Sequence, residues 1–494
     1  MNDAKKRITL IRLTVLVLLV FCGMPSGVNA HEPHVCPDDF PDTPTFQKHL
    51  RHEDIVSGAL RFGAVFDAGE RLFAARLNRC DGQGRPATTG TGAKRIADEP
   101  ARIRTSAPDA DACAGCHAQP RAGGSGDFVA NVFVLAQAAD PVITSVEPQF
   151  SNDRNTLSMF GAGPIEMLAR EMSADLQAQA VGKPNGVHTL TTKGVPFEVT
   201  VNGGAVVSSR GVDTDLVVKP FHQAGVVRSI REFTVNAFNH HHGLQADERF
   251  DLNPAKGPDH DEDGLEHEIT IGDITATTLY QAALATPTQV MPQGRKERIE
   301  VMLGRARFEQ IGCAACHKPA LVLNSPLFTE PNPSNPPGTF ADVSQTVSFD
   351  MTRFGEKPRL KKREDGKIMV HAFTDLKRHH LCDPLGQMDA IRHFCNEQLA
   401  QGRPDQDGHP GSEFFITRKL WDVGDSGPYG HRGDLTTIAE AILAHGGEGR
   451  ASRDAFAALP IASRMSIVAF LKTLQGAPIA QHARRAQETS HDGP

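Results

Sequence analysis

The stretches that decide the fold are Cys113-Ala114-Gly115-Cys116-His117 and Cys313-Ala314-Ala315-Cys316-His317. Each presents two thiols and the following histidine within about one turn of chain. Two thiols at this spacing add to the vinyl groups of haem, and the histidine ligates its iron. A thioredoxin-like pair is expected once and in a βαβ unit, and a zinc site needs a second cysteine pair about 15–20 residues away. We therefore expect two covalently attached c-type haems.

Amphipathic segments lie around the second motif. The one that runs into Cys313 contains Gly304 and carries apolar residues at Ile299, Met302, Leu303 and Phe308. The other covers Ser463–Leu474, with Met465, Val468, Leu471 and Leu474 along one side. They are similar to the crossed first and last helices of a c-type cytochrome domain, where glycine allows close approach of the two helices. Gly69 and Phe73 repeat the glycine–phenylalanine spacing before the first motif, although a loop near residues 81–111 intervenes.

The rest of the sequence predicts more helices and one β element. Residues 187–220 alternate apolar and polar positions around Asn202-Gly203-Gly204, which predicts a β-hairpin. Further helices are expected at Ile165–Gln179, Ile274–Leu284, Arg295–Ile311 and Leu435–Ala444. The predicted fold class is therefore mainly α, with two c-type cytochrome domains and a small β-hairpin insertion in the first. We expect an N-terminal haem domain over residues 31–290, a C-terminal cytochrome c domain over 291–480 and a flexible tail over 481–494.

Residues 1–30 have the pattern of a cleavable secretory signal. Basic residues at positions 5, 6, 7 and 12 precede an apolar stretch from Leu13 to Met24, and small residues ending at Ala30 follow. The stretch is shorter than the roughly 20 residues of a membrane span, so a retained anchor is the weaker interpretation. Lipidation at Cys22 is a further alternative, which bulky Phe21 disfavours. We expect a periplasmic protein with no membrane span after signal cleavage.

Composition narrows the possible functions. The chain has 494 residues, 39% of them hydrophobic, and a formal net charge of -7, which becomes more negative once the basic signal is removed. These values exclude general disorder, and they disfavour nucleic acid and anionic membranes as partners, whereas a basic protein fits the charge. Histidine is abundant, with 22 residues, which favours a metal or haem function.

The remaining cysteines predict disulfides. Of the nine cysteines, Cys22 lies in the signal and four lie in the haem motifs. In an oxidising compartment the other cysteines should be paired. Cys382 and Cys395 share one segment and most simply pair with each other, which leaves Cys36 with Cys80. Thiolate ligation of haem iron is the alternative.

One acidic loop has the spacing of a calcium site. Asp259, Asp261 and Asp263 alternate along the chain before Gly264, and Glu268 follows. Successive carboxylates at this spacing can surround a hard cation while glycine makes the turn. The loop departs from an EF-hand because Thr270 occupies the twelfth position, so a solvated acidic turn is the alternative to calcium.

Together these residues resemble the bacterial dihaem c-type oxidoreductases, relatives of dihaem cytochrome c peroxidases and MauG-type enzymes. The resemblance covers most of residues 60–475. Besides the two CxxCH motifs, it rests on Arg154-Asn155, Phe160–Glu166, His241–Gln245, Glu248–Phe250, Phe373–His379, Leu420-Trp421, Pro428–Gly433, Glu440–Ile442 and His445–Glu448. The family's common HDMG is here His379-His380-Leu381-Cys382, and the interhaem tryptophan of the peroxidases has no counterpart before the second motif.

The resemblance implies two electronically coupled haems, one storing or relaying an electron and one open to an oxidant. At the open haem, Glu166 is the candidate proton donor and Arg154 the candidate charge that polarises the O–O bond. A helix-start carboxylate and a surface arginine are the alternative roles. Trp421 is a candidate electron relay between the haems, or a packed core aromatic.

Histidines supply the candidate sixth iron ligands. The candidates are His240, His241, His242, His379, His380, His431 and His445. We expect His379 to ligate the second haem and His241 or His242 the first, and each could instead be an ordinary hydrogen-bonding histidine.

The leading functional hypothesis is an exported, peroxidase-like dihaem oxidoreductase. It would reduce hydrogen peroxide or a related oxidant with electrons from a small periplasmic electron-transfer protein. A dihaem electron carrier without catalysis and a MauG-like oxidase of a protein or organic substrate are the alternatives. A high-spin, five-coordinate iron would favour an enzyme over a carrier.

Overall fold

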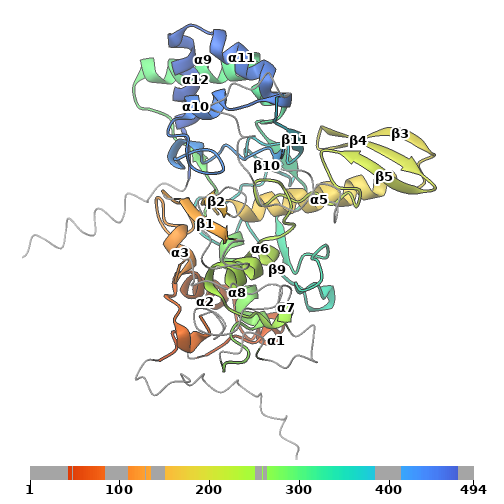
Figure 1. Cartoon of the computed structure of the whole chain (residues 1–494), viewed down its shortest axis with the longest axis vertical. Coiled ribbons are helices and arrows are strands. Elements are labelled where there is room, and N and C mark those ends of the chain that lie inside the picture. The colour runs from red at the N-terminus through yellow and green to blue at the C-terminus, as the bar shows by residue number, and fades with distance from the viewer. Residues whose placement is uncertain are drawn as a thin grey trace, which may run out of the picture.

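A computed structural model describes residues 43–46, 48–83, 110–127, 129–134, 151–250, 259, 264–383 and 413–476. One long helix, α5 (Ala162–Ala180), crosses the middle of the molecule. Helices that precede residue 283 gather on one side of α5, and helices that follow residue 294 gather on the other (Figure 1). The expected signal segment lies outside the described residues. Within those residues, no helix has the length and apolarity needed to cross a bilayer.

Side-chain caps mark the start of some of the helices. Thr270 and Thr437 each accept a hydrogen bond from the main-chain N–H three residues later, and Ser229 does the same for Glu232. The remaining α-helices are α1 (His52–Val56), α2 (Phe62–Ala74), α3 (Cys113–Cys116), α6 (Ile230–Ala237), α7 (Asp247–Phe250), α8 (Ile271–Ala282), α9 (Arg295–Gln310), α10 (Ile438–Leu443), α11 (Arg450–Ala458) and α12 (Ile461–Lys472). The shorter turns are η1 (Arg79–Asp81), the π-helix η3 (Phe238–His242), η5 (Cys313–Ala315), η6 (Val343–Gln345), η8 (Val423–Asp425) and η9 (Gly447–Gly449).

The predicted fold class was wrong. Helices make up 37% of the structure and strands 17%, which is an ordinary mixed composition and not a mainly α one. Most sheets are short antiparallel pairs: β1 (Val129–Val134) with β2 (Ser151–Asn155), β6 (Thr288–Gln289) with β13 (Leu474–Gln475), β7 (Leu321–Leu323) with β10 (Ile368–Val370), β8 (Leu327–Glu330) with β9 (Val347–Asp350), and β11 (Arg378–His380) with β12 (Phe414–Ile416). Small sheets interrupt the helices, and β6–β13 pairs segments from the two predicted domains, so two simple cytochrome domains do not describe the architecture.

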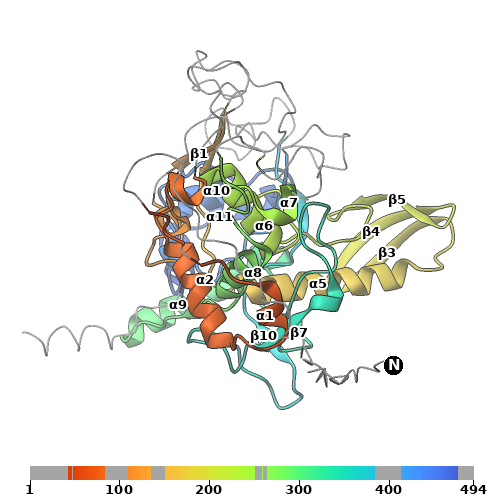
Figure 2. The ribbon, with the colours of Figure 1, turned by 90° about the horizontal axis from the view of Figure 1, so that it is seen from below.

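The β insertion has one strand more than the predicted hairpin, and it covers fewer residues. It is a three-stranded antiparallel sheet of β3 (Gly186–Thr192), β4 (Val195–Asn202) and β5 (Ala205–Arg210). Only β4 shows the full buried–exposed alternation, because β3 and β5 are the edges. Val217 and Val218, expected in the hairpin, lie beyond the last strand. The sheet and the end of α5 project from the body as an arm (Figures 1 and 2).

Two close helix crossings repeat in the molecule. In the first, α2 crosses α8, and a Cβ added at Gly69 would overlap the main chain of Ala276 and lie 2.7 Å from the Tyr280 Cβ. In the second, α9 crosses α12, and a Cβ at Gly304 would overlap the Ser466 carbonyl. Glycine is required at both crossings because any side chain would separate the helices. The predicted α9–α12 crossing is confirmed.

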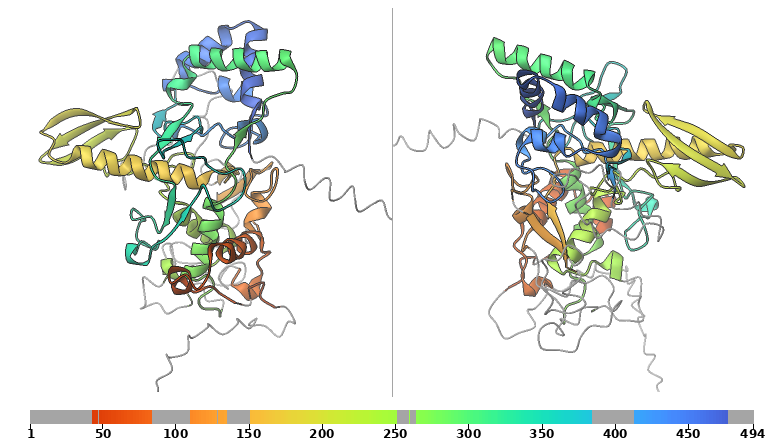
Figure 3. Two further views of the ribbon diagram at one scale, coloured as in Figure 1. Left: turned by 180° about the vertical axis from the view of Figure 1, so that it is seen from behind. Right: turned by 45° about the horizontal axis from the view of Figure 1, so that its top comes forward.

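The face of α9 that enters this crossing differs from the predicted one. Val301, Gly304 and Phe308 are buried, whereas Ile299 and Leu303 are each 47% exposed and Met302 is 66% exposed. Helix α9 therefore has two apolar faces, and only one of them packs against the protein. Figure 3 shows α9 at the outer edge of its end of the molecule.

The main hydrophobic core extends across the predicted domain boundary near residue 290. It joins residues of α2, α5 and α8 to Leu321, Phe328, Met351 and Trp421. A second cluster contains Val301, Phe308, Ile438, Phe456 and Phe470 from α9–α12. The domain limits stay a prediction.

Candidate functional site: the two CxxCH motifs

The first motif forms the short helix α3, and its histidine follows directly. His117 is partly buried, and its Nδ1 lies 3.2 Å from the Gly124 carbonyl, to which it donates. Burial lowers the pKa of His117 to about 4, so the ring is neutral at physiological pH. The Phe73 ring packs 6.0 Å from the His117 ring, which connects the motif to the α2–α8 crossing.

The second motif repeats this arrangement. The Nδ1 of His317 lies 3.1 Å from the Phe373 carbonyl, and burial lowers the pKa of His317 to about 4. The Phe308 ring packs 6.4 Å from the His317 ring and 5.6 Å from the Phe470 ring at the α9–α12 crossing. Each motif is thus held by a phenylalanine placed four residues after the glycine of its crossing.

Both motifs suit a covalently held haem. All four motif cysteines are in the thiol form, and burial raises the pKa of Cys113 to about 12 and that of Cys313 to about 11. A ligating histidine ordinarily donates its second ring N–H to a carbonyl or carboxylate, which fixes the ring for metal binding. His117 and His317 both do so through Nδ1, so an iron would be ligated through Nε2.

Both ring nitrogens of His379 lie within hydrogen-bond distance of a carboxylate. Its Nε2 lies 2.9 Å from Asp375 and its Nδ1 lies 2.8 Å from Glu448, while Cys316 Sγ is 3.9 Å from Nδ1. Burial lowers the pKa of His379, but its hydrogen bonds to Asp375 and Cys316 outweigh burial and raise the pKa to about 11. Attachment of haem would consume the Cys316 thiol and remove its effect on the pKa of His379, whereas Asp375 and Glu448 would remain. His379 as the sixth ligand stays a prediction.

His445 lies close to the second motif histidine. The His317 and His445 ring centres are 6.4 Å apart with their planes at 69°. Metal–imidazole bonds are about 2 Å long, so two imidazoles on opposite sides of one ion hold their ring centres about 6 Å apart. The Nδ1 of His445 donates to the Ala441 carbonyl at 2.8 Å. This separation fits a pair of ligands on one iron.

Arg154 lies in a group of basic side chains close to the first motif. Burial lowers the pKa of His222 to about 3, and the charges of Arg154, His431 and His241 lower it further. His241 acts in the same direction on His117, although burial is the larger cause. The group is held by β2, because the Asn155 N–H donates to the His431 carbonyl at 2.8 Å. The sequence analysis missed His222, which stands in no recognisable motif.

Glu166 occupies a different place from the one the resemblance implied. It is fully buried in α5 and accepts hydrogen bonds from the Ile230 N–H at 2.8 Å and from Asn332 at 3.1 Å. Burial raises its pKa to about 7, and Glu330 adds to this effect. Within the described residues these contacts belong to the α5–α6 junction and not to Cys113–His117. The catalytic role of Glu166 stays a prediction.

His242 contacts the first motif directly. It is buried at the end of η3, with Nε2 3.5 Å from Cys113 Sγ and Nδ1 2.6 Å from the Ala110 carbonyl. His241 is the neighbour whose charge acts on His117. The structure therefore brings both predicted ligands to the first motif without deciding between them.

The calcium prediction falls largely outside the described residues. Asp261 and Asp263 are not described, and Asp259 accepts from the Gly264 N–H at 3.0 Å. Glu268 is buried, and its Oε2 accepts from the Gln245 N–H at 2.8 Å. Calcium stays a prediction.

Trp421 lies at the junction of the two ends of the molecule. It is 2% exposed and belongs to the core shared with α2, α5 and α8. The adjoining Leu420 packs against the α9–α12 cluster. The buried Lys419 donates to the carbonyls of Ser158 and Phe160 at 3.1 and 3.3 Å. Trp421 is a packed core aromatic, at a position between the two motifs.

The described cysteines outside the motifs are oxidised. Cys80 and Cys382 are both disulfide-bonded. Cys36 and Cys395 lie outside the described residues. The predicted pairings therefore stay predictions.

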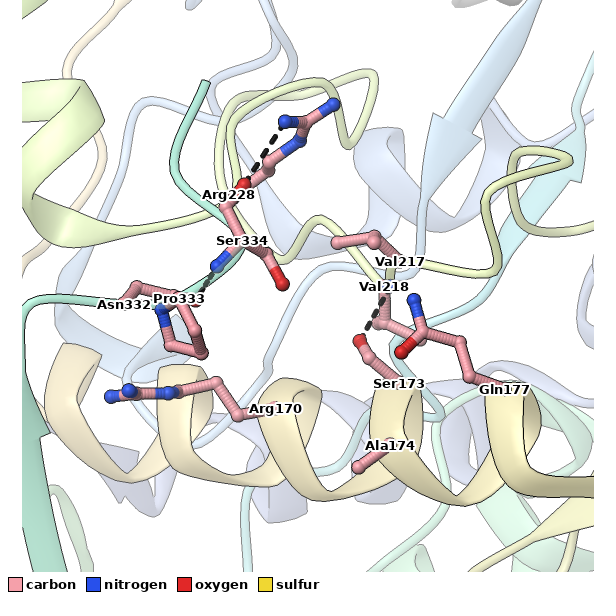
Figure 4. A pocket seen from close by; sticks show the side chains of 10 residues that line it. All are labelled: Arg170, Ser173, Ala174, Gln177, Val217, Val218, Arg228, Asn332, Pro333 and Ser334. Carbon is pink, nitrogen blue, oxygen red and sulfur yellow. Dashed lines mark hydrogen bonds between the residues drawn. The ribbon is translucent and has the colours of Figure 1, made fainter. Parts of the chain in front are cut away.

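A small cavity of about 110 Å³ opens beside α5 (Figure 4). It is lined by Arg170, Ser173, Ala174, Gln177, Val217, Val218, Arg228 and residues 332–334. The two arginines are used structurally, because Arg170 donates to the Thr329 and Pro331 carbonyls and Arg228 donates to the Ser334 carbonyl. Neither CxxCH motif lines the cavity, so we do not assign chemistry to it.

Residues 354–474 match the family described as "Di-haem oxidoreductase, putative peroxidase". The match confirms the family resemblance for this segment, which contains His379, Trp421 and His445 but neither CxxCH motif. No curated protein matches the chain. Among solved structures, hydrazine synthase of Kuenenia stuttgartiensis is 13% identical, with 96% of this chain and 100% of that chain covered, at a TM-score of 0.31. A similarity at that score carries no argument about fold or function.

Proposed function

We propose that this chain is an exported di-haem oxidoreductase that reduces hydrogen peroxide or a related oxidant with electrons from a small periplasmic redox protein. The observation that carries the proposal is the repeated geometry of the two motifs. At each, a partly buried, neutral histidine donates Nδ1–H to a main-chain carbonyl beside two thiols. The family match over residues 354–474 supports an oxidoreductase of the di-haem class.

Cys113, Cys116 and His117 would hold one haem, and Cys313, Cys316 and His317 the other. When bound, each haem supplies an iron that exchanges one electron and can bind an oxidant where its sixth position is open. The protein's part is to fix the ligating rings, exclude water and place charge.

At the second motif we assign the sixth ligand to His445 in place of the expected His379. The 6.4 Å between the His317 and His445 ring centres would let both rings hold one iron. Asp375 and Glu448 instead hold His379 as a protonated, positively charged ring. Two tight imidazole ligands suit the second site to electron storage, because they leave no position for an oxidant.

The first motif is the better candidate for oxidant reduction. Arg154 supplies a fixed positive charge that would polarise an O–O bond, and His222 beside it stays neutral, because burial lowers its pKa to about 3. His241 and His242 remain the candidate ligands on this side. Trp421 lies in the core between the motifs, where an aromatic side chain would shorten the path of an electron.

The test compares His445→Ala with His379→Ala in the mature holoprotein. Spin-state spectroscopy should show that His445→Ala converts one low-spin haem to high spin, while His379→Ala leaves both spin states unchanged. The reverse result would return the ligand to His379. Peroxide consumption, driven by a small chemical reductant, should fall at least tenfold in Arg154→Ala. Two low-spin haems in every redox state, without peroxide turnover, would make the protein an electron carrier instead.

A further inference from the structure

Arg418 lies directly beside the second motif. Burial lowers the pKa of His317, and the Arg418 carbonyl is close enough to that ring to act in the opposite direction. The same ring donates its Nδ1–H to the Phe373 carbonyl at 3.1 Å. The Leu420 N–H, shortly after Arg418, donates to the Ala372 carbonyl at 2.9 Å. These contacts hold the main chain of Arg418 next to the histidine that would ligate the second iron.

The Arg418 side chain lies deep in the protein and still has open space beside it. Burial lowers the pKa of its guanidinium, and the charge of Asp422 opposes this effect. Nevertheless, 34% of the side chain is accessible. A side chain that is both desolvated and accessible lines an internal space and not the outer surface. The rings of His317 and His445 combine the same two features, since both are partly accessible and burial lowers both pKa values.

The guanidinium of Arg418 has no hydrogen bond to any of the described residues. Its Nη2 lies 3.8 Å from Asp422 Oδ2, which is beyond hydrogen-bond distance. That oxygen accepts instead from Lys419 Nζ at 2.8 Å. Burial lowers the pKa of Lys419 to about 8, and the charge of Arg418 contributes to this, whereas Asp422 and Asp425 oppose it.

Arg418 therefore lacks a partner that a buried cation ordinarily has. Buried charges in proteins are paired and hydrogen-bonded, because an unpaired charge is costly to remove from water. Among the described residues, Asp422 is the carboxylate whose charge acts on Arg418, and Lys419 holds it more closely. An anion in the internal space beside His317 would complete the pairing.

We propose that Arg418 binds a propionate of the haem at the second motif and is a positioning residue for that cofactor. Propionates are the anionic side chains of haem, and a guanidinium binds a carboxylate through paired N–H donors in a fixed geometry. The proposal rests on the haem binding in the proposed function. It adds a non-covalent anchor to the attachment through Cys313 and Cys316.

The charge of Arg418 would also act on the oxidation state of the second iron. Reduction adds one electron to the iron, and no bond forms or breaks. A nearby cation opposes the additional positive charge of the oxidised form, so it favours the reduced form. Arg418 would thus help the second site to hold an electron.

Redox titration and resonance Raman spectroscopy of the mature holoprotein test the proposal. In Arg418→Gln, we expect the reduction equilibrium constant of the low-spin haem to fall at least threefold, which is about 28 mV at about 59 mV per tenfold change. The propionate bending bands of one haem should shift as well. Arg363→Gln is the matched control, because it removes an equal charge at a 50% exposed arginine that pairs with Asp365 at 3.6 Å. It should change neither measurement.

Arg418→Lys separates the charge of the side chain from its packing. Lysine keeps the positive charge, so the equilibrium constant should stay within twofold of that of the unmodified protein. An equal fall in Arg418→Lys and Arg418→Gln would overturn the proposal, and so would unchanged Raman bands in Arg418→Gln. A potential of the unmodified protein that varies with acetate concentration at constant ionic strength would assign Arg418 to a mobile anion and would also overturn it.

Intact mass separates this proposal from the proposed function. Absence of covalent haem at the second motif of the unmodified protein would overturn both. Two covalent haems per chain, together with unchanged Raman bands in Arg418→Gln, would overturn the role of Arg418 alone.

Discussion

Gly161 and Trp421 provide a quantitative test of how the two ends of the molecule are joined. Gly161 precedes α5 with φ 71°, a left-handed conformation that costs a non-glycine residue about 1–2 kcal/mol. A Cβ at this position would overlap the Trp421 indole, lying 2.6 Å from Cη2, and would be 3.0 Å from Pro287 Cδ. Carbon atoms pack at about 3.5–4.0 Å, so the indole, whose Cζ2 lies even closer than its Cη2, would have to move by about 1.5 Å.

Overpacking of this kind costs about 1–3 kcal/mol in addition to the backbone strain. We therefore expect Gly161→Ala to lower the free energy of unfolding by about 2–5 kcal/mol. Gly182→Ala is the control, because Gly182 has φ +73° with nothing within 4 Å of its added Cβ. Gly182→Ala should therefore lose only the backbone strain, about 1–2 kcal/mol.

Urea unfolding of the holoprotein, followed by haem absorbance and by circular dichroism, measures both variants. Trp421→Phe removes part of the indole, so Gly161→Ala combined with Trp421→Phe should lose at least about 1 kcal/mol less than the sum of the single changes. Equal destabilisation by Gly161→Ala and Gly182→Ala would refute the packing argument. If the effects of Gly161→Ala and Trp421→Phe are additive, the role given to Trp421 is refuted.

Further predictions follow from the helix crossing, the buried carboxyl and the acidic loop. Gly304→Ala should lower the free energy of unfolding by about 1–3 kcal/mol, because the added Cβ would overlap Ser466, and the melting temperature should fall with it. Gly63→Ala is the control: it adds a Cβ in open space on α2 and should raise the free energy of unfolding by about 0.5–1 kcal/mol. Burial raises the pKa of Glu166 in the folded state to about 7, against an ordinary value of 4.5. The free energy of unfolding should therefore decline as pH rises through this window, by up to about 3 kcal/mol. Urea titrations at pH 5 and 8 should show this decline in the unmodified protein and a smaller one in Glu166→Gln. Chelation should lower the melting temperature if calcium binds, and Asp261→Ala should abolish that response; a chelator without effect on the unmodified protein argues against the site.

Local sequence signals predicted the helices and the two motifs well. The expected helix at Arg295–Ile311 ends one residue earlier in the structure, and the glycine–phenylalanine spacing at Gly304 and Phe308 correctly identified a crossing. These features depend on periodicity and on short-range spacing, both of which are present in one segment of chain.

The orientation of α9 and most of the sheets could not be predicted in this way. Helix α9 carries two apolar faces, and periodicity alone does not say whether Ile299 or Val301 is buried. The short sheets pair distant segments, such as β7 with β10, and strands of two to four residues are too short to show alternation. The fold class was wrong for this reason.

The candidate site was predicted only where its chemistry is local. The CxxCH motifs are complete in sequence, but the approach of His445 to His317 depends on how the α10–η9 segment folds back over the second motif. His222 and Arg154 are distant in sequence and only the tertiary structure brings them together. Conversely, Glu166 stands in a recognisable string, and its side chain is committed to the α5–α6 junction.

The α2–α8 crossing has a consequence for the order in which the protein can be completed. Helix α2 and the first motif are synthesised early, but α8 begins only at Ile271, after the whole arm and α6. Until then Phe73 and His117 lack the surface that encloses them, so Cys113 and Cys116 remain accessible during synthesis. If haem is attached at the first motif, as we propose, the attachment would have an open time window before the fold closes around it, and an insertion that delays α8 further would lengthen that window.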